Sequence, residues 1–97
     1  MDYHLWLVDA SGTGREASVV CEVTPRLRAR HAGWAIERLC ALVNAQTRVR
    51  LSGWLMMDPL HADQVGNTRG TTWEIHPILA IDVERNGKWV ALDNVTA

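Results

Sequence analysis

The feature that most constrains the fold is a set of short strand-like stretches, divided by turn residues and interrupted by one stretch of helical spacing. Strands are predicted where β-branched and aromatic residues are frequent or where apolar and polar residues alternate, at residues 3–8, 17–24, 47–57, 71–84 and 88–92. A helix is predicted at residues 34–43, because nearby apolar residues share one helical face: Ala32, Ile36, Leu39, Cys40 and Val43. The predicted order is β-β-α-β-β-β, an α+β domain made mainly of strand.

Three local features add detail to this pattern. Gly53 lies in the middle of a predicted strand, which favours a sharp bend or a close approach of another backbone segment. Pro77 divides the stretch 71–84 and fits a bulge or an edge position. The stretch 58–70 is long and polar, and loops of this length in a small domain often carry function.

Length and composition set broad limits. A chain of 97 residues fits one domain spanning 1–97. The formal net charge of −1 lowers the expectation of nucleic-acid binding, which an excess of basic residues would favour. Cys21 and Cys40 lack a metal-binding spacing such as C-x-x-C, and we predict two reduced, buried thiols. Because neither a signal peptide nor an apolar run of about 18 residues is visible, the expectation is a cytoplasmic protein with no membrane span.

Three motifs carry a resemblance to a known family. They are E-V-T-P-R from Glu22, G-W-L-x-x-D-x-x-H from Gly53 and W-E-I-H-P from Trp73. Together they resemble an uncharacterised family of bacterial proteins, over about residues 3–83. The resemblance implies an OB-like β-barrel, in which a helix lies between the third and fourth strands, and it implies no activity. The strand that would come first in that barrel is missing, so the prediction is a small, partly open OB-like β-barrel.

The missing strand leads to a prediction about partners. Either the stretch 88–92 closes the barrel within one chain, or the open strand edge pairs with a second copy, because unpaired strand edges seek partners. We predict a homodimer. Trp54 and Met56 are the predicted interface residues, since Trp and Met are enriched at interfaces, although a place in the core would also suit them.

Histidine and carboxylate groups form the candidate metal site. Glu74 and His76 alternate along one strand and share a face, Asp58 and His61 lie in the preceding loop, and His4 and Glu22 lie on what would be neighbouring strands. The predicted ligands are His4, Asp58, His61, Glu74 and His76. Imidazole nitrogens and carboxylate oxygens could bind zinc or another divalent ion and activate a water molecule. A structural explanation competes with this, because no compact metal-binding motif such as H-E-x-x-H is present.

A nucleic-acid surface is a further alternative. OB-folds commonly bind single strands with stacked aromatic rings in a basic groove. The candidate residues are Arg48, Arg50, Trp54 and Trp6. The near-neutral charge argues against this alternative.

The sequence therefore predicts a non-enzymatic binding or assembly module, with no catalytic residue and no cofactor. A metal-dependent hydrolase and a single-stranded nucleic-acid binding protein are the alternatives.

Overall fold

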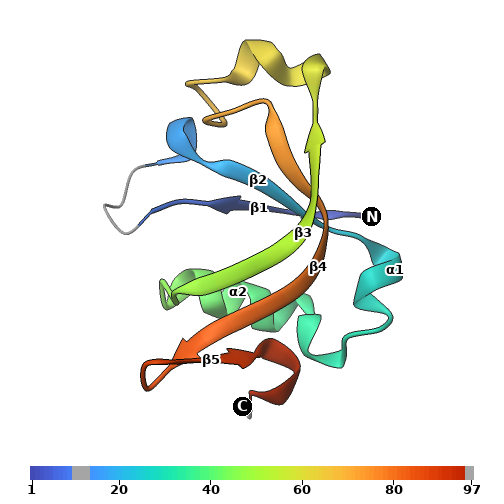
Figure 1. Cartoon of the computed structure of the whole chain (residues 1–97), viewed down its shortest axis with the longest axis vertical. Coiled ribbons are helices and arrows are strands. Elements are labelled where there is room, and N and C mark those ends of the chain that lie inside the picture. Colours follow the sequence, from blue (N-terminus) through green and yellow to red (C-terminus); the bar gives the residue numbers. More distant parts are fainter. Residues whose placement is uncertain (10–13, 96–97) are drawn as a thin grey trace.

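Five strands form one mixed sheet in the described part of the chain, which comprises residues 1–9 and 14–95 of a computed structural model. The strand order is β1-β2-β4-β3, and β5 is added to β4 (Figure 1). The strands are β1 (Tyr3–Leu7), β2 (Val19–Val23), β3 (Val49–Met57), β4 (Trp73–Arg85) and β5 (Lys88–Ala91). The helices are α1 (Pro25–Arg28) and α2 (Ile36–Asn44), with 3-10 turns η1 (Arg15–Ala17), η2 (Ala32–Trp34), η3 (Pro59–Gln64) and η4 (Leu92–Asn94). The predicted α+β class and the predicted order of strands around the main helix are confirmed.

β4 connects the parts of the sheet. It pairs antiparallel with β3 along most of its length, parallel with β2 through its first residues, and antiparallel with β5 through its last residues. In Figure 1 it curves from the side of η3 through the middle of the molecule to β5. Because of its parallel pairing with β2, two segments far apart in the sequence lie next to each other.

Gly53 lies where the backbones of the paired strands β3 and β4 approach each other closely. The pairing register shifts on either side of this residue. A Cβ atom at this position would lie 2.3 Å from the carbonyl oxygen of Pro77, so only glycine fits without movement. The predicted close approach is confirmed. β4 continues through Pro77, whose peptide bond to His76 is cis.

The core lies between one face of the sheet and α2. Its buried residues come from β2, η2, α2, β4 and η4: Cys21, Val23, Trp34, Leu39, Ile78, Ile81, Val83 and Leu92. Trp34 is the largest of them, and its ring stacks on His31 at a centroid distance of 3.9 Å. The other four tryptophans are more than one-third exposed.

Two details of the predicted helix were wrong. α2 begins at Ile36, because Ala32–Trp34 forms a separate 3-10 turn that buries Trp34. Cys40 is exposed, whereas Cys21 is buried as predicted. α2 packs on the sheet through Leu39, and the next residue is rotated by about 100° around the helix, so its thiol leaves the core. Among the described helices, none is both long enough and apolar enough to cross a membrane.

The sheet does not close into a barrel. β1 and β3 are the end strands of the path, and no pairing joins them within residues 1–9 and 14–95. β5 is short and pairs with the last part of β4, so it does not bridge the gap. A cavity of about 470 Å³ lies between β1, α2 and the first half of β3, and its lining is mostly apolar. The observed fold therefore shares with the predicted open barrel a mixed sheet that has a helix packed on it.

Candidate functional site

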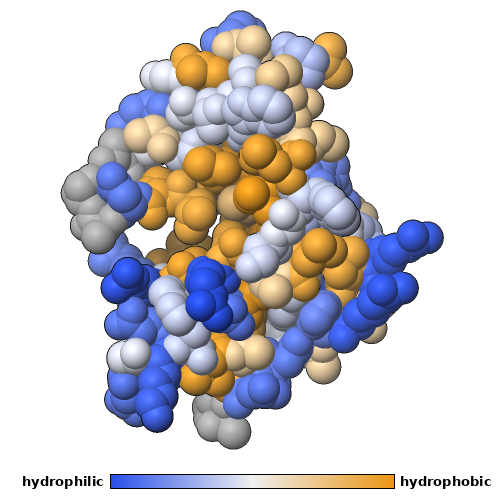
Figure 2. Space-filling view, viewed as in Figure 1, coloured by the Kyte–Doolittle hydropathy of each residue, from blue (hydrophilic) through white to orange (hydrophobic). Residues whose placement is uncertain are grey.

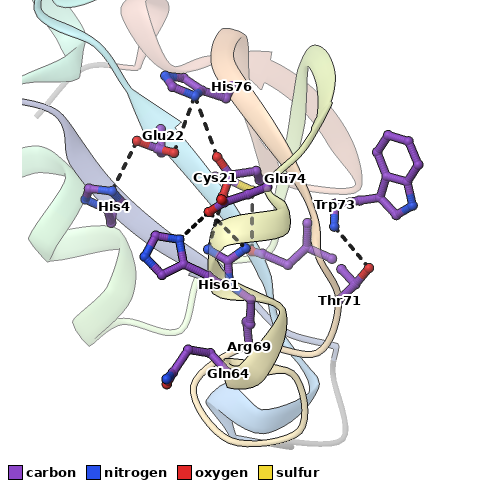
Figure 3. A network of polar contacts seen from close by, with 12 residues as sticks. His4, Cys21, Glu22, His61, Gln64, Arg69, Thr71, Trp73, Glu74 and His76 are labelled. Carbon is purple, nitrogen blue, oxygen red and sulfur yellow. Dashed lines mark hydrogen bonds and ion pairs between the residues drawn. The ribbon is translucent and has the colours of Figure 1, made fainter.

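Three neighbouring strands bring His4, Glu22 and His76 into one row on the face of the sheet opposite the core. His4 of β1 is the direct partner of Glu22 of β2. The parallel pairing of Cys21 with Ile75 places Glu22 beside His76 of β4. The Nε2 atom of His4 lies 3.1 Å from Glu22 Oε1, and the Nδ1 atom of His76 lies 3.5 Å from Glu22 Oε2 (Figure 3).

The row continues into a second group of polar side chains. The Nδ1 atom of His76 is 3.6 Å from Glu74 Oε1, and the other carboxylate oxygen of Glu74 accepts a 3.0 Å hydrogen bond from Arg69. A second guanidinium nitrogen of Arg69 lies 3.6 Å from Asp58 Oδ2, which contacts His61 at 2.5 Å. One network of polar contacts therefore runs from β1 to η3 (Figure 3).

The five predicted metal ligands all belong to this network but do not form one coordination sphere. Asp58 and His61 lie on the far side of the Arg69 guanidinium, whose positive charge disfavours a cation there. A compact group instead consists of Asp2, Glu22 and His76, in which one ligand atom of each residue lies within 4.8 Å of the others. Of the predicted ligands, His76 belongs to this group; His4 and Glu74 each contact a member of it.

The predicted cluster omitted Asp2, and it contained Glu22 without counting it among the five ligands. Because side chains alternate along a strand, a strand extended two residues before His4 would place Asp2 on the same face as His4. The pairing of the first two strands indicates that Glu22 lies beside His4. The contact of Glu22 with His76 depends on the parallel pairing of β2 with β4. Side-chain spacing within one strand gives no signal for that contact.

Two buried carboxylates lie in contact at the centre of the network. The side chains of Glu22 and Glu74 are 10% and 3% exposed. The pKa of Glu22 is raised to about 8. The largest cause is burial, the next is the hydrogen bond and negative charge of Glu74, and the last is the nearby Asp2. The Nδ1 atom of His76 is buried and has no hydrogen-bond partner among the described residues. Burying so many ionisable groups is costly, and it is typical of functional sites.

Neither cysteine takes part in this site as a nucleophile. Burial, together with the negative charge of Glu74, raises the pKa of the Cys21 thiol to about 12, so the thiolate is scarce at neutral pH. Cys40 is exposed on α2, away from the sheet face that carries the network.

Both arginines of the predicted nucleic-acid surface are paired with carboxylates. Arg48 pairs with Glu84 at 3.2 Å, and Arg50 pairs with Asp82 at 2.9 Å. Both guanidinium groups lie near the ring of Trp89, at 5.7 Å and 5.0 Å from its centre. Their charges are thus largely balanced within the chain.

The two predicted aromatic residues lie on β1 and β3. Trp6 of β1 stacks with Arg15, whose guanidinium carbon is 3.8 Å from the ring centre. Trp54 lies in the second half of β3 and is two-thirds exposed. Nucleic-acid binding stays a prediction.

An apolar strand edge is the second notable surface. Residues 54–57, here called the β3 apolar edge, are all exposed, and they include the predicted interface residues Trp54 and Met56. Figure 2 shows apolar side chains across the middle of the molecule, while hydrophilic ones cover α1 and the turn between β4 and β5.

The chain matches no protein-family model, no curated protein and no solved structure. The resemblance to a bacterial family with an OB-like barrel therefore stays a prediction. Function has to be argued from the side chains of the site, because a fold alone does not specify one.

Proposed function

We propose that the protein is a non-enzymatic binding module whose ligand is a divalent metal ion held by Asp2, Glu22 and His76. The observation that carries this proposal is the close approach of one ligand atom from each of the three residues. Two carboxylate oxygens and one imidazole nitrogen are a ligand set that zinc and related ions accept. The side chains of Asp2 and His76 are each about one-third exposed, so an ion can enter from solvent.

The distance between Asp2 and His76 suits a coordinated ion. Asp2 Oδ2 lies 3.7 Å from the Nε2 atom of His76. Two ligands of a tetrahedral zinc ion, with bonds of about 2.0–2.1 Å, lie about 3.3–3.4 Å apart. The observed separation is close to that value and exceeds the length of an ordinary hydrogen bond. Glu22 offers a third ligand atom within 4.8 Å of the other two.

The surroundings of His76 support a ligand role for its ring. A ligating histidine usually donates its second ring N–H to a carboxylate, which fixes the orientation of the ring. With Nε2 as the ligand, Nδ1 would face Glu74, which Arg69 holds in place. His4 is half exposed and contacts Glu22 Oε1, so it lies next to the proposed ligands.

A proton is the competing occupant of the site. Arg69 balances the charge of Glu74. Glu22 still faces two further carboxylates, and its raised pKa means that it retains a proton at neutral pH. A divalent ion would displace that proton, because a metal-bound carboxylate must be ionised.

The test compares two histidines of the same network. Protein freed of metal with EDTA is titrated with Zn²⁺ and with Mn²⁺ by calorimetry, and the complex is weighed by native mass spectrometry. We expect one ion per chain, binding at least about tenfold weaker in His76→Ala and Glu22→Gln, and unchanged binding in the control His61→Ala. Calorimetry in two buffers of different ionisation enthalpy would show proton release on binding.

Two results would overturn the proposal: no binding at millimolar ion, or equal weakening in all three variants. If the zinc-loaded protein hydrolysed an activated ester faster than the His76→Ala variant, the module would have to be reclassified as an enzyme.

For the fold, we propose kinship with OB-like barrels in an open form. The position of α2 between β2 and β3 supports this, as does the long, bent β4. The gap between β1 and β3 lies where a closing strand would be needed.

A further inference from the structure

The β3 apolar edge is exposed on both faces of the sheet. Side chains alternate along a strand, so Trp54 and Met56 lie on one face and Leu55 and Met57 on the other. The exposed fractions are 67% for Trp54, 64% for Leu55, 39% for Met56 and 49% for Met57. An antiparallel strand in a monomer usually buries one face in the core, whereas this half of β3 leaves apolar side chains exposed on both faces.

The backbone of this segment is also available for pairing. β4 occupies one side of it, through the pairs Leu55–Ile75, Met56–Glu74 and Met57–Trp73. β3 is the last strand in the sheet order, so its other side is an edge. Proteins usually protect such an edge with charged residues or proline, and residues 51–57 contain neither.

We propose that the β3 apolar edge pairs antiparallel with the same segment of a second copy of this chain. This would join the two sheets into one across a two-fold axis near Leu55 and Met56. A two-fold interface requires one surface that is complementary to itself. An uncharged strand that is apolar on both faces meets this requirement, because its partner must also be uncharged and apolar on both faces.

The two-fold axis sets the antiparallel arrangement. An axis perpendicular to the sheet reverses the direction of the strand, so the two copies of the apolar edge run antiparallel. The flanking charges of Arg48, Arg50 and Asp58 are already paired within the chain and contribute little to this contact.

The exposed apolar area is large enough to matter. Leu60 and Trp73, which lie next to the edge in the sequence and in the sheet, are also exposed. If a fully exposed large side chain presents about 150–250 Å², the six residues together offer roughly 500–900 Å². A stable interface buries about 800 Å² per partner. The apolar edge and its neighbours would therefore supply most of a dimer interface.

The test is the mass of the protein in solution, measured by light scattering after size exclusion at several concentrations with EDTA present. EDTA removes metal, so failure of the metal-binding proposal and failure of this one are distinguishable. We expect a wild-type dimer at tens of micromolar, and a monomer for Leu55→Lys and for Met57→Lys. The control is Val43→Lys on α2, where the native side chain is 63% exposed and the dimer should persist.

Circular dichroism would show that each variant is folded, and a second lysine variant guards against a failure to fold in the first. A monomeric wild type at 100 µM would overturn the proposal, and so would a dimer that survives both lysine variants. A dimer lost equally in Val43→Lys would place the interface elsewhere. Slower amide exchange at residues 54–57 in concentrated than in dilute protein would support strand pairing directly.

Discussion

Replacing Arg69 by methionine should destabilise the protein strongly, because it leaves a buried carboxylate without its cation. The Arg69 and Glu74 side chains are 8% and 3% exposed, and the hydrogen bond between them is 3.0 Å long. At this separation and an effective dielectric constant of about 20, the Coulomb attraction is on the order of 5 kcal/mol. Removing one partner of a buried pair typically costs about 3–5 kcal/mol. Methionine keeps most of the apolar stem, so lost packing contributes little.

We therefore expect Arg69→Met to lower the free energy of unfolding by about 3–5 kcal/mol. Urea denaturation followed by tryptophan fluorescence measures this loss of stability.

The matched control is Arg50→Met, which removes an exposed arginine from its 2.9 Å pair with Asp82. Exposed pairs contribute about 0.2–1 kcal/mol. If Arg69→Met costs no more than Arg50→Met, this account of the buried pair is wrong.

Three further predictions concern the fold. Gly53→Ala should lower the free energy of unfolding by about 1–3 kcal/mol, because the added Cβ would lie 2.3 Å from a backbone oxygen of β4; an unchanged urea midpoint would contradict this. Ellman's reagent at pH 7.5 should modify the exposed Cys40 and spare the buried Cys21 until the protein unfolds, and two fast thiols would show that the core is open. Burial alone would raise the pKa of Asp93, but the hydrogen bond from His31 and other contacts lower it overall. Its contribution to stability should therefore be present above its ordinary pKa and lost as the pH falls through the lowered one, so Asp93→Asn should flatten the acid limb of the stability profile.

The periodicity of apolar residues predicted the strands and the main helix of this chain, but it could not predict which strands would pair with each other. Alternation and turn residues located the strands, and Gly53 marked the crossing of β3 and β4, because these signals are local in the sequence. The pairing of β2 with β4 joins residues about 54 positions apart, and no local pattern encodes it. The contact between Glu22 and His76 therefore became visible only with the sheet topology.

The same limit explains what was missed in the candidate site. Asp2 precedes the predicted strand and carries no motif of its own. Arg69 lies in a polar loop, where a buried arginine is not expected from composition. Cys40 belongs to the apolar stripe of α2, but a short helix that packs mainly through Leu39 leaves the edge of that stripe in solvent.

The central position of β4 has a consequence for how much of the chain is needed for folding. A chain that ends before β4 contains β1, β2, α2 and β3, but β2 then lacks its neighbour on one side, and α2 has no sheet of sufficient width to cover. A two-stranded hairpin is marginally stable at best by itself. Chains truncated before residue 73 should therefore stay sensitive to protease, and protection should arise once β4 is complete.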